Sequence, residues 1–317
     1  MTTVDVSVVI PTYNMDFCLA DCLQGLAGQT LTTGTFEIIL VDDGSHDQTL
    51  ATAQRLKEEL GLANLKLAHQ QNAGPAAARN HGIRLAEGAI IAFLDSDCVP
   101  QSGWLEHLSA PMRDHPALVG VEGRTLPAPG KRTLMDHYID NPNGGYCWTC
   151  NIAFRRSLLL EIGGLDEGFP LPSGEDIDLA HRMRQRGDIA FAPEALVYHL
   201  ILPRSFQKHL RVARTFSSMI RLHRKHPGLL TNGEGFGHVV LFQFKQLLLP
   251  IITRRREFPK APLAYLQFCL LQVLMAVDTL LLLPQYYREA TSPLRVLEPF
   301  SDPAGQAMQS EPRDVAS

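Results

Sequence analysis

The chain has 317 residues, 45% of them hydrophobic and 20% charged, which excludes a small disulfide scaffold, a fibrous repeat and a disordered chain. Its formal net charge of -4 gives no electrostatic basis for a nucleic-acid partner, and we expect none. The charge is unevenly spread, because residues 200–260 contain twelve Lys and Arg against two acids. We therefore expect this segment to meet anions.

The first hundred residues alternate between strand-like and helix-like patterns. Strands are predicted over residues 4–10, 36–41, 65–69 and 89–94, and helices over residues 47–60 and 74–86. This alternation predicts a mostly parallel sheet with right-handed crossovers, in which ligands bind beyond the carboxyl ends of the strands. The polar residues that follow the strands, at positions 11–14, 42–45 and 95–97, should therefore converge on one cleft.

The middle of the chain is less regular. Helices are predicted over residues 155–162 and 176–186, each closed by glycine, and short strands over residues 189–192 and 196–199. Cys147 and Cys150 have CxxC spacing, but the sequence contains no second such pair to complete a zinc site. We interpret them as free thiols that line a pocket or the core, in a chain whose N-terminal sequence favours a reducing, cytoplasmic setting.

From residue 204 onward the sequence predicts a basic amphipathic helix followed by two apolar stretches, at residues 238–253 and 263–283. The second stretch reaches the roughly 20 residues that a membrane span requires. If both stretches crossed, the basic connector at residues 254–256 would lie outside, against the positive-inside tendency. We therefore favour a re-entrant or surface-lying hairpin over a two-span anchor. Residues 289–317 are expected to lack fixed structure.

Two strand ends carry carboxylates suited to a nucleotide ligand. In extended backbone the side chains of Asp95 and Asp97 point the same way, and such oxygen ligands suit Mg²⁺ or Mn²⁺ shared with substrate phosphates. A solvated acidic turn is the alternative. Asp42 and Asp43 match the hydrogen-bond donors of a ribose hydroxyl or a base imide, and helix capping is the structural alternative; for Asp42 we favour the nucleotide contact.

Three further positions have both a functional and a structural interpretation. Arg79 follows a small-residue helix N-terminus that suits phosphate, and it either reaches that phosphate or braces the acidic turn. The acids of Ser173-Gly174-Glu175-Asp176 either cap a helix N-terminus, or one of their carboxylates is a general base aimed into the cleft. His199 ends a short apolar strand, where it either completes a metal site begun by Asp97 or is a structural histidine.

Together these segments resemble the inverting glycosyltransferases of family 2, which have the GT-A fold. The resemblance covers about residues 4–200. The matching motifs are Val6-Ser-Val-Val-Ile-Pro-Thr-Tyr-Asn14, Val41-Asp-Asp-Gly-Ser45, Asn72-Ala-Gly-Pro-Ala-Ala-Ala-Arg-Asn80, Phe93-Leu-Asp-Ser-Asp97, Asn151-Ile-Ala-Phe-Arg155, Gly163-Gly-Leu-Asp166, Gly174-Glu-Asp-Ile-Asp-Leu179 and Val197-Tyr-His199.

The resemblance implies an α/β, Rossmann-like GT-A domain over residues 1–200. The basic and apolar patterns predict a helical, membrane-associating extension over residues 201–288. It implies that Pro11, Tyr13 and Asp42 contact the nucleoside of a nucleotide-sugar. Asp95 would hold the ribose, and Asp97 would be the direct ligand of the metal on the diphosphate. Asp176 would deprotonate the acceptor hydroxyl, and His199 would assist at the diphosphate or the metal.

The resemblance therefore implies an inverting transferase, dependent on Mg²⁺ or Mn²⁺, that moves a sugar from a UDP-, GDP- or dTDP-linked donor to an acceptor hydroxyl. A saccharide or lipid-linked acceptor in glycan or envelope synthesis is expected, with the enzyme peripheral or monotopic at the inner face of the plasma membrane. Cys98 departs from the pattern, because an acid or Asn is common there in relatives. Residues 143–150 indicate no particular acceptor sugar.

Two alternatives remain open from the sequence. A sugar-nucleotide nucleotidyltransferase would also hold a nucleotide over a parallel sheet, but it normally carries a glycine-rich signature near the first strand, which residues 11–14 lack. An inactive glycosyltransferase-like membrane scaffold is the non-enzymatic alternative. The presence of acidic residues at positions 42, 95, 97 and 176 argues against it.

Overall fold

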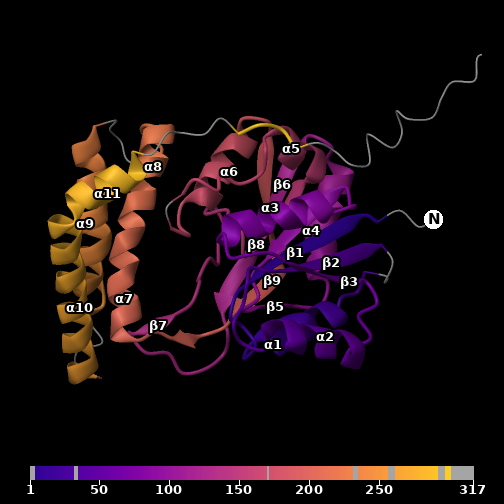
Figure 1. Cartoon of the computed structure of the whole chain (residues 1–317), viewed down its shortest axis with the longest axis horizontal. Helices are drawn as coiled ribbons and strands as arrows, with labels where there is room; N and C mark the ends of the chain where they lie inside the picture. The colour runs from indigo at the N-terminus through magenta and orange to yellow at the C-terminus, as the bar shows by residue number, and fades with distance from the viewer. Residues whose placement is uncertain are drawn as a thin grey trace, which may run out of the picture.

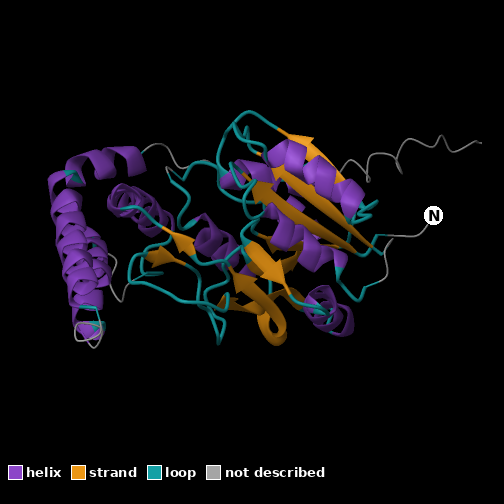
Figure 2. Cartoon of the chain, turned by 90° about the horizontal axis from the view of Figure 1, so that it is seen from below, coloured by secondary structure: helices purple, strands orange, loops and turns teal. Residues whose placement is uncertain are grey.

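The computed structural model describes residues 4–31, 35–169, 171–230, 235–255, 261–291 and 297–300. An α/β part built on an eight-stranded sheet lies beside a separate layer of helices formed by the last third of the chain (Figure 1). A perpendicular view shows the strands and the helical layer as neighbouring units (Figure 2).

The sheet combines a parallel half with a mixed half. Its order is β3 (Leu65–His69), β2 (Phe36–Asp42), β1 (Val6–Thr12), β4 (Ile90–Leu94), β8 (Asn151–Arg155), β6 (Leu118–Pro127), β9 (Asp188–His199) and β5 (Cys98–Pro100). The first four strands run parallel, and β6 is parallel to β9, whereas β8 and β5 are antiparallel to their neighbours. The predicted mostly parallel sheet is confirmed.

Helices cover both faces of this sheet, and each face has its own apolar core. Alternate residues of β1 divide between the two cores: Val8 and Ile10 belong to one and Val9 to the other. The first core includes α1 (Leu19–Ala27), α2 (Thr49–Glu59) and α4 (Trp104–Asp114), and the second includes α3 (Pro75–Leu85), α5 (Arg156–Glu161) and α6 (Glu175–Arg184). Burial on both faces explains why the central strands are continuous apolar runs.

The structure differs from the predicted elements at β9. The two short strands expected over residues 189–192 and 196–199 form one strand, Asp188–His199. Its pairing with β6 skips residues 193–195, because the register shifts between Gly123 and Arg124. A bulge at this position absorbs Pro193, which cannot donate a ladder hydrogen bond. The break predicted between residues 192 and 196 therefore exists, but it is a bulge inside one strand.

The helical layer begins with α7 (Phe206–Val212) and α8 (Phe216–Lys225), which a short 3₁₀ turn separates within the single predicted helix. Phe216 and Ile220 pack inward against Tyr286 of α11 (Leu283–Ala290). The two apolar stretches form α9 (Phe236–Thr253) and α10 (Pro262–Leu281). Within the described part of the chain, these two helices are long and apolar enough to cross a membrane.

The end of the described chain returns to the α/β part. The Phe300 N–H donates to the Leu160 carbonyl at 2.8 Å, and the Phe300 ring packs on the core beneath α5. Residues 297–300 thus have a defined position, although the sequence analysis placed them in a tail without fixed structure. Residues 301–317 of that predicted tail lie outside the described residues.

Part of the basic helix faces the protein itself. Lys225 Nζ lies 2.9 Å from Asp166 Oδ2 and 2.7 Å from Asp178 Oδ1, and Arg221 Nη2 lies 3.4 Å from the same Asp166 oxygen. Asp178 is also contacted by His226 of the helical layer. Within the segment predicted to meet anions, Arg221 and Lys225 therefore meet carboxylates of the protein itself. Both contact Asp166, and Lys225 also joins α8 to α6 through Asp178.

These contacts change the acidity of both buried carboxylates. Burial alone would raise the pKa of Asp178, but the hydrogen bond from His226 and the charges of Arg182 and Lys225 outweigh it and hold the pKa well below its usual range. Lys225 does the same for Asp166 against its burial, with help from Arg221. Because both carboxylates are ionised in the folded state, losing a cationic partner leaves negative charge buried.

We predict that Lys225→Met lowers the free energy of unfolding by about 2 kcal/mol at neutral pH, since it removes one cation from two buried carboxylates. Urea unfolding followed by circular dichroism measures this. Lys208→Met on the exposed face of α7 is the control and should change stability little. Equal effects of the two variants would contradict the structural role of Lys225.

Candidate active site

A cavity of about 1010 Å³ opens at the carboxyl ends of β1 and β4. Elements that are distant in the sequence line it: the end of β1, the turn after β4, the start of α3, the loop before β8 and the start of α6. Of the residues proposed from sequence, Pro11, Tyr13, Arg79, Asp95, Asp97 and Asp176 line this cavity. The expected convergence of separate polar segments on one cleft is therefore present.

Arg79 lies among the carboxylates of this cleft. Its guanidinium is 4% exposed and contacts Asp95 Oδ1 at 2.5 Å. Burial disfavours its charged form, but the charges of Asp95 and Glu175 outweigh burial and raise its pKa. The structure thus supports the bracing alternative for Arg79, and a side chain braced in this way still lines the cleft where a phosphate would enter.

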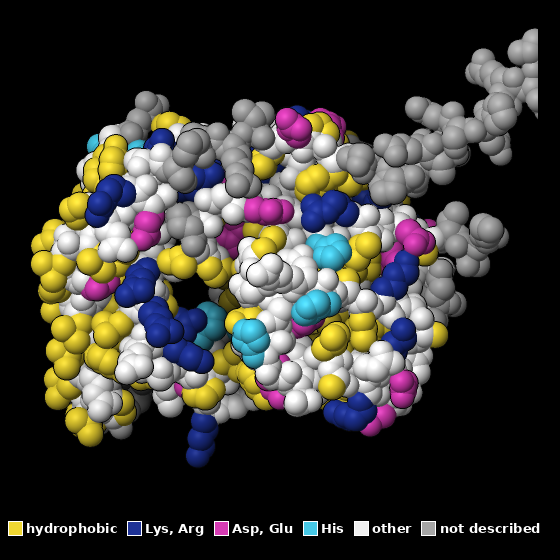
Figure 3. Space-filling view, viewed as in Figure 1, with side chains coloured by type: hydrophobic (Ala, Val, Ile, Leu, Met, Phe, Trp, Pro, Cys, Tyr) yellow, Lys and Arg dark blue, Asp and Glu magenta, His cyan; other side chains and the backbone are white. Residues whose placement is uncertain are grey.

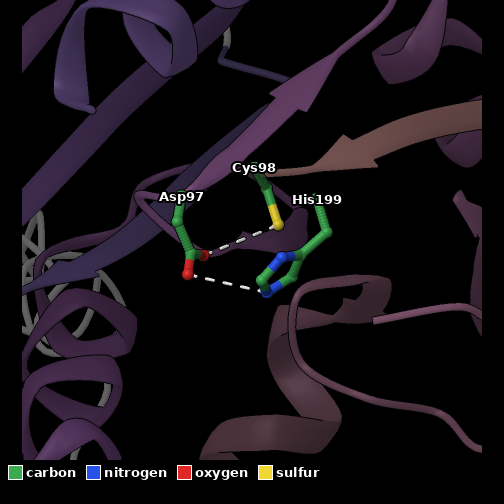
Figure 4. A group of neighbouring side chains, drawn as sticks. All are labelled: Asp97, Cys98 and His199. Atoms are coloured by element: carbon green, nitrogen blue, oxygen red, sulfur yellow. Dashed lines mark hydrogen bonds and ion pairs between the residues drawn. The ribbon is translucent and has the colours of Figure 1, made fainter. Parts of the chain in front are cut away.

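Asp97 and His199 are brought together by the short antiparallel pair of β5 and β9, in which Cys98 lies opposite His199. His199 Nε2 is 3.5 Å from Asp97 Oδ2 (Figure 4). His199 Nδ1 is 2.7 Å from the Leu200 carbonyl, which only accepts hydrogen bonds, so Nδ1 carries the proton. The Nε2 lone pair therefore faces the Asp97 carboxylate.

This donor set fits a divalent cation. The ligand atoms of Asp97, Cys98 and His199 all lie within 4.8 Å of one another. A carboxylate oxygen and a neutral imidazole suit Mn²⁺ or Mg²⁺, with further positions left for water and phosphate. Burial raises the pKa of the Cys98 thiol well above its ordinary value, so this residue remains a neutral neighbour of the site.

Two adjacent acids begin α6 at the cleft. Glu175 is 6% exposed, and its Oε2 is buried without a hydrogen-bond partner among the described residues. Burial, followed by the charge of Asp176, raises the pKa of Glu175 to about 7. Burial also raises the pKa of Asp176, whose Oδ1 accepts from the Ile177 N–H at 2.8 Å. Raised carboxyl pKa values in a cleft are typical of acid–base sites.

Helix capping and a place in the cleft both apply to these acids. The N-cap of α6 is Gly174, in a left-handed conformation with φ of 90°, and it has no side chain to cap the helix. Glu175 and Asp176 are the first helical residues and line the cleft, and the Asp176 carboxylate also accepts from the first-turn Ile177 N–H. The residues alone left open which of the two carboxylates is a base, and the family resemblance pointed to Asp176.

Asp42 does not line the cavity, although its neighbour Asp43 does. The Asp42 carboxylate is buried, 2.8 Å from His69 Nδ1, and accepts from the Ser45 N–H. Asp43 accepts from the Gly74 N–H at 2.8 Å and so fixes the start of α3. The nucleoside contact assigned to Asp42 remains a prediction. The sequence offered both Asp42 and Asp43 for this contact, and of the two Asp43 lines the cleft, because adjacent strand residues face opposite ways.

Known proteins resemble this chain in both sequence and structure. Residues 7–163 match the family model described as "Glycosyl transferase family 2". Glycosyltransferase AglE of Haloferax volcanii is 40% identical over 225 residues, covering 66% of this chain and 72% of the relative. The chain belongs to glycosyl transferase family 2. Another relative, validoxylamine A glucosyltransferase of Streptomyces hygroscopicus subsp. limoneus, is 28% identical over 279 residues, covering 74% of this chain and 61% of the relative.

Solved structures share the fold of this family 2 chain. A mannosyltransferase from Pyrobaculum calidifontis, solved with GDP-Man and Mn²⁺, aligns with a TM-score of 0.58 at 18% identity, over 87% of this chain and 86% of its own. TarS 1-349 of S. aureus, solved with UDP-GlcNAc, aligns with a TM-score of 0.55 at 20% identity, over 90% and 92%. These likenesses confirm the predicted GT-A fold.

Proposed function

We propose that this chain transfers a sugar from a nucleotide diphosphate donor to an acceptor hydroxyl, with inversion at the anomeric carbon. The observation that carries the proposal is the meeting of Arg79, Asp95, Asp97 and Asp176 in one cavity large enough for a nucleotide-sugar. The family match favours this activity over the nucleotidyltransferase alternative. The activity assay below separates it from an inactive scaffold.

The donor lies across the ends of β1 and β4 in this proposal. Tyr13 is 41% exposed at the cleft, where its ring offers a stacking surface for the base, with Pro11 beside it. Asp95 holds the ribose while Arg79 fixes its carboxylate. Solved relatives of the same fold bind UDP, UDP-GlcNAc and GDP-Man, which supports a UDP-, GDP- or dTDP-linked donor here.

Asp97 and His199 would hold Mn²⁺ or Mg²⁺, which supplies positive charge to the departing diphosphate when it is bound. The chain prepares this site through the Leu200 carbonyl, which keeps the His199 Nε2 lone pair directed at Asp97. Burial raises the pKa of Asp97, and positive charge close to it opposes that shift. A bound cation beside Asp97 would therefore favour its ionised form.

Asp176 acts as the general base in this proposal. Its raised pKa brings it closer to the working pH, so it accepts the proton of the attacking hydroxyl more readily than an ordinary aspartate would. Arg79 stabilises the ionised form and keeps the carboxylate available. Attack from the Asp176 side, opposite the leaving diphosphate, inverts the anomeric carbon.

We predict that Asp176→Asn abolishes sugar transfer by at least about 10³-fold while nucleotide-sugar binding persists, because only the proton acceptor is lost. Glu175→Gln, one residue earlier, is the matched control and should retain transfer. Transfer by Asp176→Asn within tenfold of wild type excludes Asp176 as the base.

We also predict that Asp97→Ala eliminates the Mn²⁺-dependent part of nucleotide affinity, measured by calorimetry with UDP and GDP. Cys98→Ala is the control, because its neutral buried thiol contributes no charge to the cation. It should keep the metal dependence. An Asp97→Ala affinity that still rises on adding Mn²⁺ by the wild-type factor would refute the metal assignment.

We further infer that the helical layer attaches to the cytoplasmic membrane face as a surface-lying hairpin. Hydrophobic side chains gather along the outer side of α9 and α10 (Figure 3). Leucines and an isoleucine that are more than half exposed on these helices are Leu241, Ile252, Leu263, Leu266, Leu270, Leu280 and Leu281. An apolar face of this extent, close to exposed Arg254 and Arg255, fits the interface of an anionic bilayer. The basic positions 256 and 260 lie outside the described residues.

We predict that the protein floats with vesicles of phosphatidylglycerol and phosphatidylcholine in a sucrose gradient, and that high salt alone does not release it. The double variant Leu266→Ser/Leu270→Ser should reduce the bound fraction severalfold through lost apolar burial. Leu50→Ser/Leu85→Ser, which alters exposed leucines of the α/β part, is the control and should float normally. Wild-type protein that remains unbound and forms a dimer would assign the apolar face to self-association instead.

A further inference from the structure

The loop before β8 is built around a buried carboxylate. Glu122 of β6 accepts from the Asn141 side-chain amide at 2.8 Å, the Gly145 N–H at 2.5 Å and the Cys147 N–H at 2.6 Å. The bonds from Gly145 and Cys147 come from residues 143–150, whose sequence indicated no particular acceptor sugar. A charged acceptor with several donors gives strong hydrogen bonds, so Glu122 fixes the shape of this loop.

The backbone of the loop is held in a conformation that most residues avoid. Cys147 has a φ of 55°, and Gly144 and Gly145 have φ values of 69° and 101°. A side chain at Gly144 would also collide with the Phe191 ring. A non-glycine residue at positive φ persists only where its surroundings determine it, and such positions concentrate at functional sites.

The fixed loop presents two stacked aromatic rings. The rings of Tyr146 and Trp148 are parallel within 7° and their centroids are 4.5 Å apart. Trp148 lines the cleft, while Tyr146 is 58% exposed. The aromatic surface therefore extends from the cleft wall to solvent. Exposing a large aromatic ring to water does not stabilise the protein.

The pair lies on the opposite half of the sheet from the proposed nucleoside site. Trp148 precedes β8, and the sheet order places β4 and the Asp95–Asp97 turn between β8 and the β1 end that carries Tyr13. Asp176 lines the same cavity. A ligand ring held at Trp148 would therefore share the cleft with Asp176, the proposed general base. It would lie away from Tyr13, the residue proposed to stack on the nucleobase.

We propose that Trp148 and Tyr146 form the acceptor subsite and that the acceptor presents a pyranose ring to them. The inference rests on the proposed transferase function and names its acceptor class. One face of a pyranose carries several C–H bonds, whose weakly positive hydrogens are attracted to the negative face of an aromatic ring. Stacking also covers the apolar ring surface while leaving the hydroxyl groups free for Asp176.

The chain provides its own probe for this proposal. It contains two tryptophans, and Trp104 is 0% exposed with its Nε1 donating to Asn151 at 2.8 Å. A ligand in the cleft therefore changes the emission of Trp148 and not that of Trp104. Full-length protein with Mn²⁺ and UDP or GDP is titrated with methyl β-glucopyranoside, methyl β-N-acetylglucosaminide and methyl α-mannopyranoside, with ribitol as the acyclic control.

We expect a saturable change in emission with at least one pyranoside, absent with ribitol. The change should disappear in Trp148→Phe and persist in Trp104→Phe. Tyr146→Ala, an exposed position whose replacement leaves the core intact, should weaken pyranoside binding about tenfold. No response to any pyranoside, or a response that survives in Trp148→Phe, overturns the subsite.

Calorimetry with UDP-glucose, UDP-GlcNAc and GDP-mannose on the same samples separates this inference from the proposed function. Trp148→Phe and Tyr146→Ala should bind nucleotide-sugar as the wild type does, because the subsite touches only the acceptor. Donor affinity lost in both variants would place the aromatic pair in the donor site and overturn the inference. Wild-type protein that binds none of these donors would instead contradict the proposed function, whatever the pyranosides do.

Discussion

One buried cation makes the cleft of this molecule possible. The Arg79 guanidinium touches Asp95 and lies near Glu175 and Asp176, so a single positive charge faces carboxylates from two remote segments of the chain. Without it, mutual repulsion and burial would protonate these acids or drive them apart. Arg79 comes from α3. The N-terminus of α3 is fixed in turn by the hydrogen bonds that the Gly74 and Ala73 N–H groups donate to the Asp43 carboxylate. The geometry at the donor side and at the proposed base thus depends on one helix.

The first half of the sheet was predictable from sequence because its strands are buried on both faces and read as unbroken apolar runs, as in β1 and β4. The mixed half was not. β8 and β6 carry residues such as Asn151 and Glu122, whose burial is satisfied only by partners far away in the chain, namely Trp104 and the Asn141 loop. Local patterns contain no information about those partners. The helix α1 was also missed, since its cysteine and its glycine give a weak helical signal.

The site shows the same division. The order of the motifs and their places at strand ends predicted one shared cleft, and Arg79, Asp95, Asp97 and Asp176 line it. Sequence could not decide between Asp42 and Asp43, because one residue of register reverses the direction of a side chain. Nor could it reveal that Glu175 is buried without a partner, or that Tyr146 and Trp148 stack, since both depend on how loops fold over the sheet.

The helical layer is joined to the α/β part at both of its ends and also through its middle. The chain leaves β9 near Leu200, the Lys225 ion pairs attach α8 to α6, and the Phe300 N–H bonds back to Leu160 beside the close-packed glycines at 163 and 164. Because the helical layer contacts the α/β part at several separated points, it does not move about a single hinge. The entrance of the cleft consequently keeps a constant distance and orientation relative to the outer apolar face.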